Sequence, residues 1–244
     1  MRPGDWSLDL DALLLVPALA LGYGLAARRL RPARWRIACL VAAELLLLGV
    51  FVTPLDSLAF HYLLSAHLLQ NVVIAEWAPA LLVLATPPAL AARVELLPTV
   101  CRLTHPLVAL PLWLAVYDTW HVPRLYDAAL RHPNSLLHLE HASYLVCGLL
   151  LWWPVFQGER LSDAGRAAYA FAAFVLASPL GLLLALLPRP VYGVYVHAPR
   201  IWVSALTDQQ LAGIAMATEE AVVFFAVFAW AFLRVLSRDE EGAG

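Results

Sequence analysis

Long apolar runs are the feature that most constrains what this chain can fold into. Seven of them, separated by arginine, proline or glycine, approach the length that an α-helix needs to cross a bilayer. Apolar residues make up 62% of the chain and charged residues only 14%, against roughly 25% charged residues in soluble domains. A water-soluble fold of 244 residues could not bury so much apolar surface, so we expect the chain to fold in a bilayer.

The sequence therefore predicts an all-α protein, a polytopic membrane helix bundle of about seven transmembrane helices. Backbone polar groups inside a bilayer must be hydrogen-bonded within the chain, and a helix meets that requirement within its own segment. We expect a single integral-membrane domain over residues 1–244. The expected spans are residues 10–28, 37–53, 58–86, 106–121, 135–156, 167–188 and 208–236.

The distribution of arginine predicts the orientation of the bundle. All 16 basic residues are arginine, because the chain contains no lysine. The ends of the expected spans on one side hold eleven of these arginines, and the ends on the other side hold five. Since arginine concentrates in cytoplasmic loops, we expect the N-terminus outside and the C-terminus in the cytoplasm.

Histidine, carboxyl, amide and thioether side chains gather in the outer halves of four expected spans. Such polar groups are costly in a membrane unless they face the bundle interior or water, and they usually mark a functional path. Imidazole and thioether groups both suit copper, and a nearby carboxylate can orient a histidine ligand. The candidate metal ligands are His67, His121, His138, His141 and Met216. The polar groups expected to support them are His61, Gln70, Asn71, Glu76, Asp118, Glu140, Asp208, Gln209, Glu219 and Glu220.

Helical spacing separates these polar groups into two depths. His67 and Gln70 share one face of the third span, because residues three apart are neighbours on a helix. Glu76 is nine residues from His67 and lies about half a turn round that helix. We therefore expect Glu76 in a deeper layer, with Glu219 or Glu220.

Some of the same residues also fit structural roles. His61 is expected on a helical extension of the third span, and Asp118 and His121 on one face of the last turn of the fourth. The histidines could instead form hydrogen bonds between helices, which membrane bundles do use. Asp208 and Gln209 could be mainly an N-terminal cap of the last helix.

Four stretches of the chain stand out, in this order: "SAHLLQNVVIAEWAPALLVLATPP", "YDTWHVPRLYDAAL", "HLEHASYLVCGLLLWWPV" and "LTDQQLAGIAM". Together they resemble the CtaG family of bacterial cytochrome c oxidase assembly factors. The resemblance covers roughly residues 60–236 and implies a multi-pass protein of the bacterial inner membrane that helps to mature haem-copper oxidase. It also implies a role in supplying copper, with oxidase subunits or another copper-delivery protein as partners.

The sequence departs from the family pattern at two places. The family typically shows His-Met-x-Gln-His in the third span, whereas here Leu68 replaces the methionine and Asn71 stands where the second histidine is expected. The family often continues "DQQLAG" with Met-Trp-x-Pro-Gly-Gly, whereas here Met216 is followed by "ATEEA". An amide is a poorer copper ligand than an imidazole. Either His61 and the histidines of the fifth span complete the site, or this subgroup handles something else.

The leading hypothesis is a membrane assembly factor that binds copper and is not an enzyme. One alternative is a membrane haem protein, in which paired histidines hold the iron. Another is a proton-coupled transporter that uses the deep carboxyl groups. A retinal photoreceptor is excluded because no lysine is present to form a Schiff base. A membrane metalloprotease is unexpected because the chain has no HExxH motif. The chain has no block of basic residues that would indicate nucleic-acid binding. We expect the lipid bilayer, and no nucleic acid, as a partner.

Overall fold

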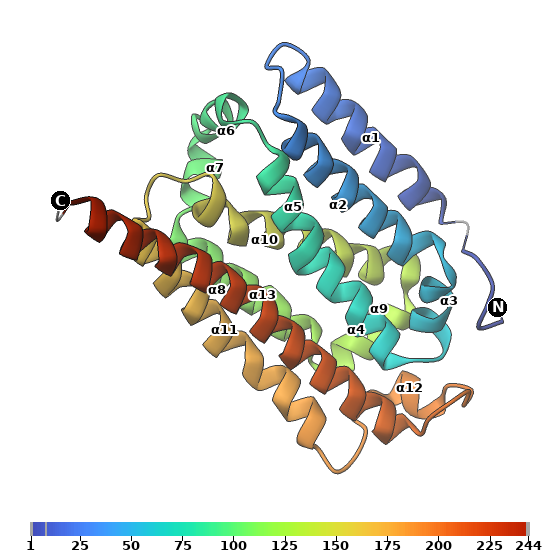
Figure 1. The fold of residues 1–244 in the computed structure, drawn as a ribbon. Coiled ribbons are helices and arrows are strands. Elements are labelled where there is room, and N and C mark those ends of the chain that lie inside the picture. The colour runs from blue at the N-terminus through green and yellow to red at the C-terminus, as the bar shows by residue number, and fades with distance from the viewer. Residues whose placement is uncertain (1, 8, 243–244) are drawn as a thin grey trace.

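The fold is all-helical, as the sequence predicts (Figure 1). The computed structural model describes residues 2–7 and 9–242, and every regular element within them is a helix. In chain order the elements are α1 (Leu10–Ala27), α2 (Arg34–Val52), α3 (Pro54–His61), α4 (Leu64–Val72), the π-helix η1 (Val73–Trp77), α5 (Ala78–Ala85), α6 (Pro88–Glu95), α7 (Pro98–Leu103), α8 (Pro106–Trp120), α9 (Pro123–Arg131), the π-helix η2 (Pro133–Leu137), α10 (His138–Phe156), α11 (Asp163–Leu186), α12 (Gly193–His197) and α13 (Ala205–Gly242).

Five helical segments of the described chain are long and apolar enough to cross a membrane. Residues Ala12–Ala27 of α1 form a shorter apolar helix, and the 15 residues of α8 reach only about 22 Å at 1.5 Å per residue. The count of seven spans therefore stays a prediction. The five segments are Arg34–Val52, Leu64–Ala85, Pro133–Phe156, Asp163–Leu186 and Ala205–Arg238.

The continuous helical segment Leu64–Ala85, formed by α4, η1 and α5, is the most enclosed of the five and lies at the centre of the bundle. It packs against α2, α10 and α13, so its side chains can meet groups from several directions. Helices α11 and α13 lie side by side (Figure 1). A Cβ atom at Gly213 would come within 2.5 Å of the backbone oxygen of Gly181, so small residues allow this close packing.

The predicted third span, residues 58–86, is wrong at its outer end. Helix α3 ends at His61, and a new helix, α4, begins at Leu64. The carboxylate of Asp208, from α13, accepts hydrogen bonds from the backbone N–H groups of Leu64 (2.6 Å) and Ser65 (3.2 Å). This carboxylate caps α4 from another helix, so His61 does not lie on a helical extension of the third span.

A π-helical turn interrupts the central helix at Val73–Trp77 and carries Glu76. Pro79 follows it and has no backbone N–H to donate four residues back. The N–H of Ala78 instead donates to the carbonyl of Val73, five residues back, and the carbonyl of Glu76 accepts from Trp152 Nε1 at 2.9 Å. A side chain of α10 thus provides a hydrogen-bond donor for a backbone carbonyl of the irregular turn.

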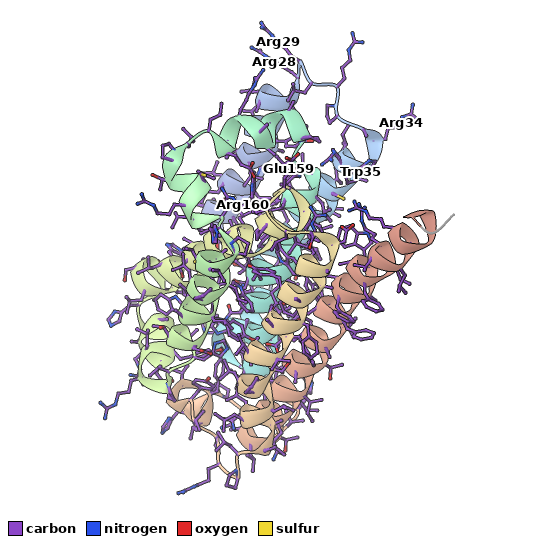
Figure 2. The ribbon with its side chains drawn as sticks, turned by 90° about the vertical axis from the view of Figure 1, so that its left-hand side faces the viewer. Arg28, Arg29, Arg34, Trp35, Glu159 and Arg160 are labelled. Atoms are coloured by element: carbon purple, nitrogen blue, oxygen red, sulfur yellow. The ribbon has the colours of Figure 1, made fainter. Side chains whose placement is uncertain are left out.

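The arginines of the α1–α2 and α10–α11 connections lie in the same half of the molecule. Figure 2 shows Arg28, Arg29, Arg34 and Arg160 in that half. Arg36 ties the start of α2 to the end of α5, because its Nη1 donates to the carbonyls of Leu84 (2.7 Å) and Thr86 (2.6 Å). Helices α3, α9 and α12 lie at the opposite end, near the N-terminus (Figure 1). The gathering of these arginines at one end of the bundle is compatible with the orientation that the sequence predicts. The orientation in a membrane stays a prediction.

Candidate functional site

Three histidines from separate elements meet in one enclosed layer at the α3–α12 end of the bundle. They are His67 of α4, His121 directly after α8, and His141 of α10. The ring centres of His67 and His141 are 6.2 Å apart. The ring of Tyr126, from α9, lies 5.2 Å from His67 and 6.1 Å from His121. We call these three histidines the histidine layer.

The hydrogen bonds of Tyr195 fix the tautomer of His67. The Tyr195 hydroxyl group lies 2.8 Å from His67 Nδ1 and donates its proton to the carbonyl of Ala59 at 2.6 Å. Because a hydroxyl group carries only one proton, Nδ1 of His67 must be the donor to the tyrosine oxygen. Nε2 of His67 therefore carries a lone pair, and it is buried with no hydrogen-bond partner.

The second histidine is held in the same way. Nδ1 of His121 lies 2.8 Å from the carbonyl of Tyr117, which can only accept, so Nδ1 carries the proton. Nε2 of His121 is buried with no partner, and so is Nε2 of His141. In metal sites, a histidine usually donates a hydrogen bond from one ring nitrogen and binds the metal ion through the other.

Helix α12 delivers Tyr195 to this layer because α9 holds its first turn. The carboxylate of Asp127 accepts hydrogen bonds from the backbone N–H groups of Gly193 and Val194, each at 3.1 Å. Burial raises the pKa of the Tyr126 and Tyr195 hydroxyl groups well above the ordinary value, so both keep their protons. The loop helices α9 and α12 thus place two neutral tyrosines beside His67, and the Tyr195 oxygen accepts the Nδ1 proton of that ring.

The other candidate ligands lie outside the histidine layer. His138 is exposed and, with His141, lines a cavity of about 320 Å³ between α1, α2 and α10. Met216 lines a different cavity, between α4 and α13. Asp118 is exposed whereas His121 is buried, so the predicted common face of these two residues is wrong.

Several supporting residues fasten helices together. Gln70 Nε2 donates to the carbonyl of Val50 at 3.0 Å and to Asp56 at 3.1 Å, which ties α4 to α2 and α3. Gln209 Oε1 accepts from the N–H of Val191 at 2.8 Å. Asp208 caps α4 rather than its own helix, since the hydroxyl group of Ser204 accepts from the first turn of α13.

A second polar layer lies deeper and consists of Glu76, Glu219 and Glu220, which we call the carboxyl layer. Glu76 and Glu220 have no exposed surface, and both carboxyl oxygens of Glu76 lack a hydrogen-bond partner. Glu219 accepts from Trp77 Nε1, and Glu220 accepts from the Tyr117 hydroxyl group at 2.6 Å. This is the grouping that the helical spacing predicts.

Comparison with known protein families gives one assignment. The family described as cytochrome c oxidase caa3 assembly factor (Caa3_CtaG) matches residues 21–238. The chain belongs to this family. Membership in Caa3_CtaG agrees with its apolar, membrane-length helices.

Two curated relatives are mycobacterial proteins. They are the uncharacterized protein Mb0105 of Mycobacterium bovis and the uncharacterized protein MT0111 of Mycobacterium tuberculosis, each 28% identical to this chain. Each alignment covers 92% of this chain and 39% of the relative, so the chain spans well under half the length of both. No solved structure matches the chain.

Asn71 stands where the His-Met-x-Gln-His pattern has its second histidine, and its side chain is buried and hydrogen-bonded. Its Nδ2 donates to Glu140 Oε1 at 3.0 Å, and the second oxygen of Glu140 is buried without a partner. Asn71 therefore connects α4 to α10 one turn from His67. In this Caa3_CtaG chain the amide has a structural partner of its own.

The tyrosines around the histidine layer were missed by sequence reasoning. Tyr126 and Tyr195 come from the short helices α9 and α12, which the seven-span pattern treated as loops. Tyrosine near a span end fits an interfacial position equally well. The only available signal was that "RLYDAAL" lies near two histidines and "GVYVH" ends in one, so the contacts with His67 could not be foreseen.

Proposed function

We propose that this Caa3_CtaG chain binds copper as its cargo in the bacterial inner membrane. It passes the ion to a subunit of cytochrome c oxidase or to another copper-delivery protein, and it catalyses no reaction. The family assignment supports the oxidase as the destination. The copper site is proposed at His67 and His141, with His121 beside them.

The observation that carries this proposal is the state of the ring nitrogens. Nε2 of His67, His121 and His141 is buried and without a hydrogen-bond partner in each case. A buried polar atom without a partner costs about 1–3 kcal/mol, so three in one layer favour a role in binding a ligand. Neutral imidazole nitrogen is a good ligand for copper.

The spacing of the rings favours an ion held by two ligands. Two imidazoles that bind one ion in line, with bonds of about 2 Å, place their ring centres about 6 Å apart. The ring centres of His67 and His141 are 6.2 Å apart. Within residues 2–7 and 9–242, no three histidine, cysteine or acidic side chains are arranged to hold a metal ion. Monovalent copper accepts such two-coordinate binding, so Cu(I) is the proposed cargo.

Copper titration of the purified chain tests the site. The chain in detergent is given Cu(I) without oxygen, in competition with a coloured Cu(I) chelator, and the bound copper is measured. We expect tight binding by the wild type and loss of that binding in His67→Ala and in His141→Ala. His132→Ala is the matched control, because His132 is exposed and lies outside the histidine layer.

Two outcomes would contradict the proposal. If the double variant His67→Ala/His141→Ala keeps the copper content and affinity of the wild type, the assigned pair is wrong. A Soret band in the visible spectrum of the purified chain would instead show that the histidines hold haem.

A further inference from the structure

The carboxyl layer lies outside the proposed copper site, and its arrangement is unusual. Glu76, Glu219 and Glu220 come from η1 and α13 and lie within electrostatic range of one another. The ion pairs found in the described part of the chain involve other carboxylates, namely Asp127 and Asp163. Three acidic groups without a cation are costly in a membrane interior, and such residues usually face a functional path.

The surroundings of the layer hold neutral donors. From α8, Tyr117 donates to Glu220, and Asp118 contributes a further negative charge. From η1, Trp77 donates to Glu219, and from α11, Ser178 lies beside Glu220. Because carboxylates this close repel one another in a low-dielectric interior, the layer is stable when it shares bound protons.

The burial of Glu76 indicates a ligand for this side chain. Its side chain has no exposed surface, neither of its oxygens has a partner, and its strongest electrostatic neighbours are Glu219 and Glu220. The π-helical turn that carries Glu76 is a rare irregularity that is frequent at functional sites. A carboxyl group held in this way needs a proton or a cation.

A cavity lies beside this layer, along α4 and α13. It has a volume of about 220 Å³, lies between α4 and α13, and is lined by Ser65 at one end and by Trp77 and Glu219 at the other. The 12 residues from Ser65 to Trp77 cover about 18 Å of helix. Ser65 is hydrogen-bonded to Asp208, so polar groups lie at both ends of an otherwise apolar cavity lining.

We propose that Glu76, Glu219 and Glu220 form a proton-binding site that exchanges protons with the α3–α12 end of the bundle through the cavity at Glu219. The ligand is the proton, shared among the three carboxyl groups. Glu219 is the point of entry because it is the member of the layer that lines the cavity. The proposal is independent of copper in the histidine layer.

Infrared spectroscopy of the full chain in lipid bilayers tests this. A protonated carboxyl group gives a C=O band that shifts when the proton is replaced by deuterium. We expect such a band in the wild type, a loss of intensity in Glu76→Gln and in Glu219→Gln, and exchange on transfer to D₂O. A spectrum that all three Glu→Gln changes leave intact would overturn the site.

The entry route is tested without altering the carboxyl groups. Ala215 lines the cavity, so Ala215→Phe narrows it, whereas Ala226→Phe on the exposed face of α13 is the matched control. We expect several-fold slower deuterium exchange of the carboxyl band in Ala215→Phe and the wild-type rate in Ala226→Phe. Equal rates in the folded variants would overturn the route, and copper titration of the same samples tests the histidine layer separately.

Discussion

Gly148 is the position where α10 comes closest to the π-helical turn of the central helix. A Cβ atom there would overlap the carbonyl oxygen of Ala75 and lie 2.6 Å and 2.9 Å from the Cγ and Cβ atoms of Pro79. Favourable carbon contacts lie at about 3.5–4.0 Å, so Gly148→Ala requires a backbone movement of roughly 1 Å. The obstructing atoms belong to a backbone carbonyl and a proline ring, so no side chain can rotate away.

The expected cost of Gly148→Ala follows from two opposing terms. Overpacking of this kind destabilises by about 1–3 kcal/mol, and the better helix propensity of alanine returns up to about 1 kcal/mol. We expect a net loss of about 1–2 kcal/mol. Since a chain of this length loses about 2–4 °C in Tm per kcal/mol, thermal unfolding in detergent should shift down by about 2–8 °C.

Gly49→Ala in α2 is the matched control for this experiment. Gly49 is also inside a membrane-length helix, but a Cβ atom there meets nothing within 4 Å. We expect an unchanged or slightly raised Tm, because only helix propensity acts. If Gly148→Ala proves as stable as Gly49→Ala, the close packing of α10 against the π-helical turn is refuted.

Three further predictions concern other contacts. Tyr195→Phe removes the partner of His67 Nδ1, so copper affinity in the chelator competition should fall about 10–100-fold while the bound amount at saturation is kept. Asp208→Ala removes the cap of α4 and should lower the free energy of unfolding by about 1–2 kcal/mol. The Ser65 amide should then exchange its hydrogen faster, and unchanged exchange would contradict the cap. Cys101, in α7 at the arginine-rich end, should react with a membrane-impermeant maleimide in inverted vesicles and not in intact cells, once the other two cysteines are serine.

The apolar runs predicted the helical fold well because each long run must become a helix in a bilayer, whatever its neighbours are. The limits of α2, α8 and α11 follow from proline and arginine in the sequence and lie within a few residues of the prediction. The break after His61 was not predictable. It depends on the carboxylate of Asp208, which is 144 positions away from Leu64 in the chain.

The candidate site was predicted in part, for the same reason. Position along a helix gives depth, so the sequence separated the His67 layer from the Glu76 layer. It could not give the direction in which a side chain points once several helices pack together. His138 and His141 are three residues apart, yet His138 is exposed while the Nε2 atom of His141 is buried.

Tyr117 joins the two polar layers and makes the register of α8 important for both. Its carbonyl oxygen accepts the Nδ1 proton of His121, and its hydroxyl group donates to Glu220 at the next depth. The ring between these two groups is buried and stacks on Trp113, with ring centres 5.0 Å apart. A shift of α8 along its axis would therefore change the anchoring of His121 and the hydrogen bonding of Glu220 together. Tyr117 thus links the anchor of His121 to the carboxyl layer.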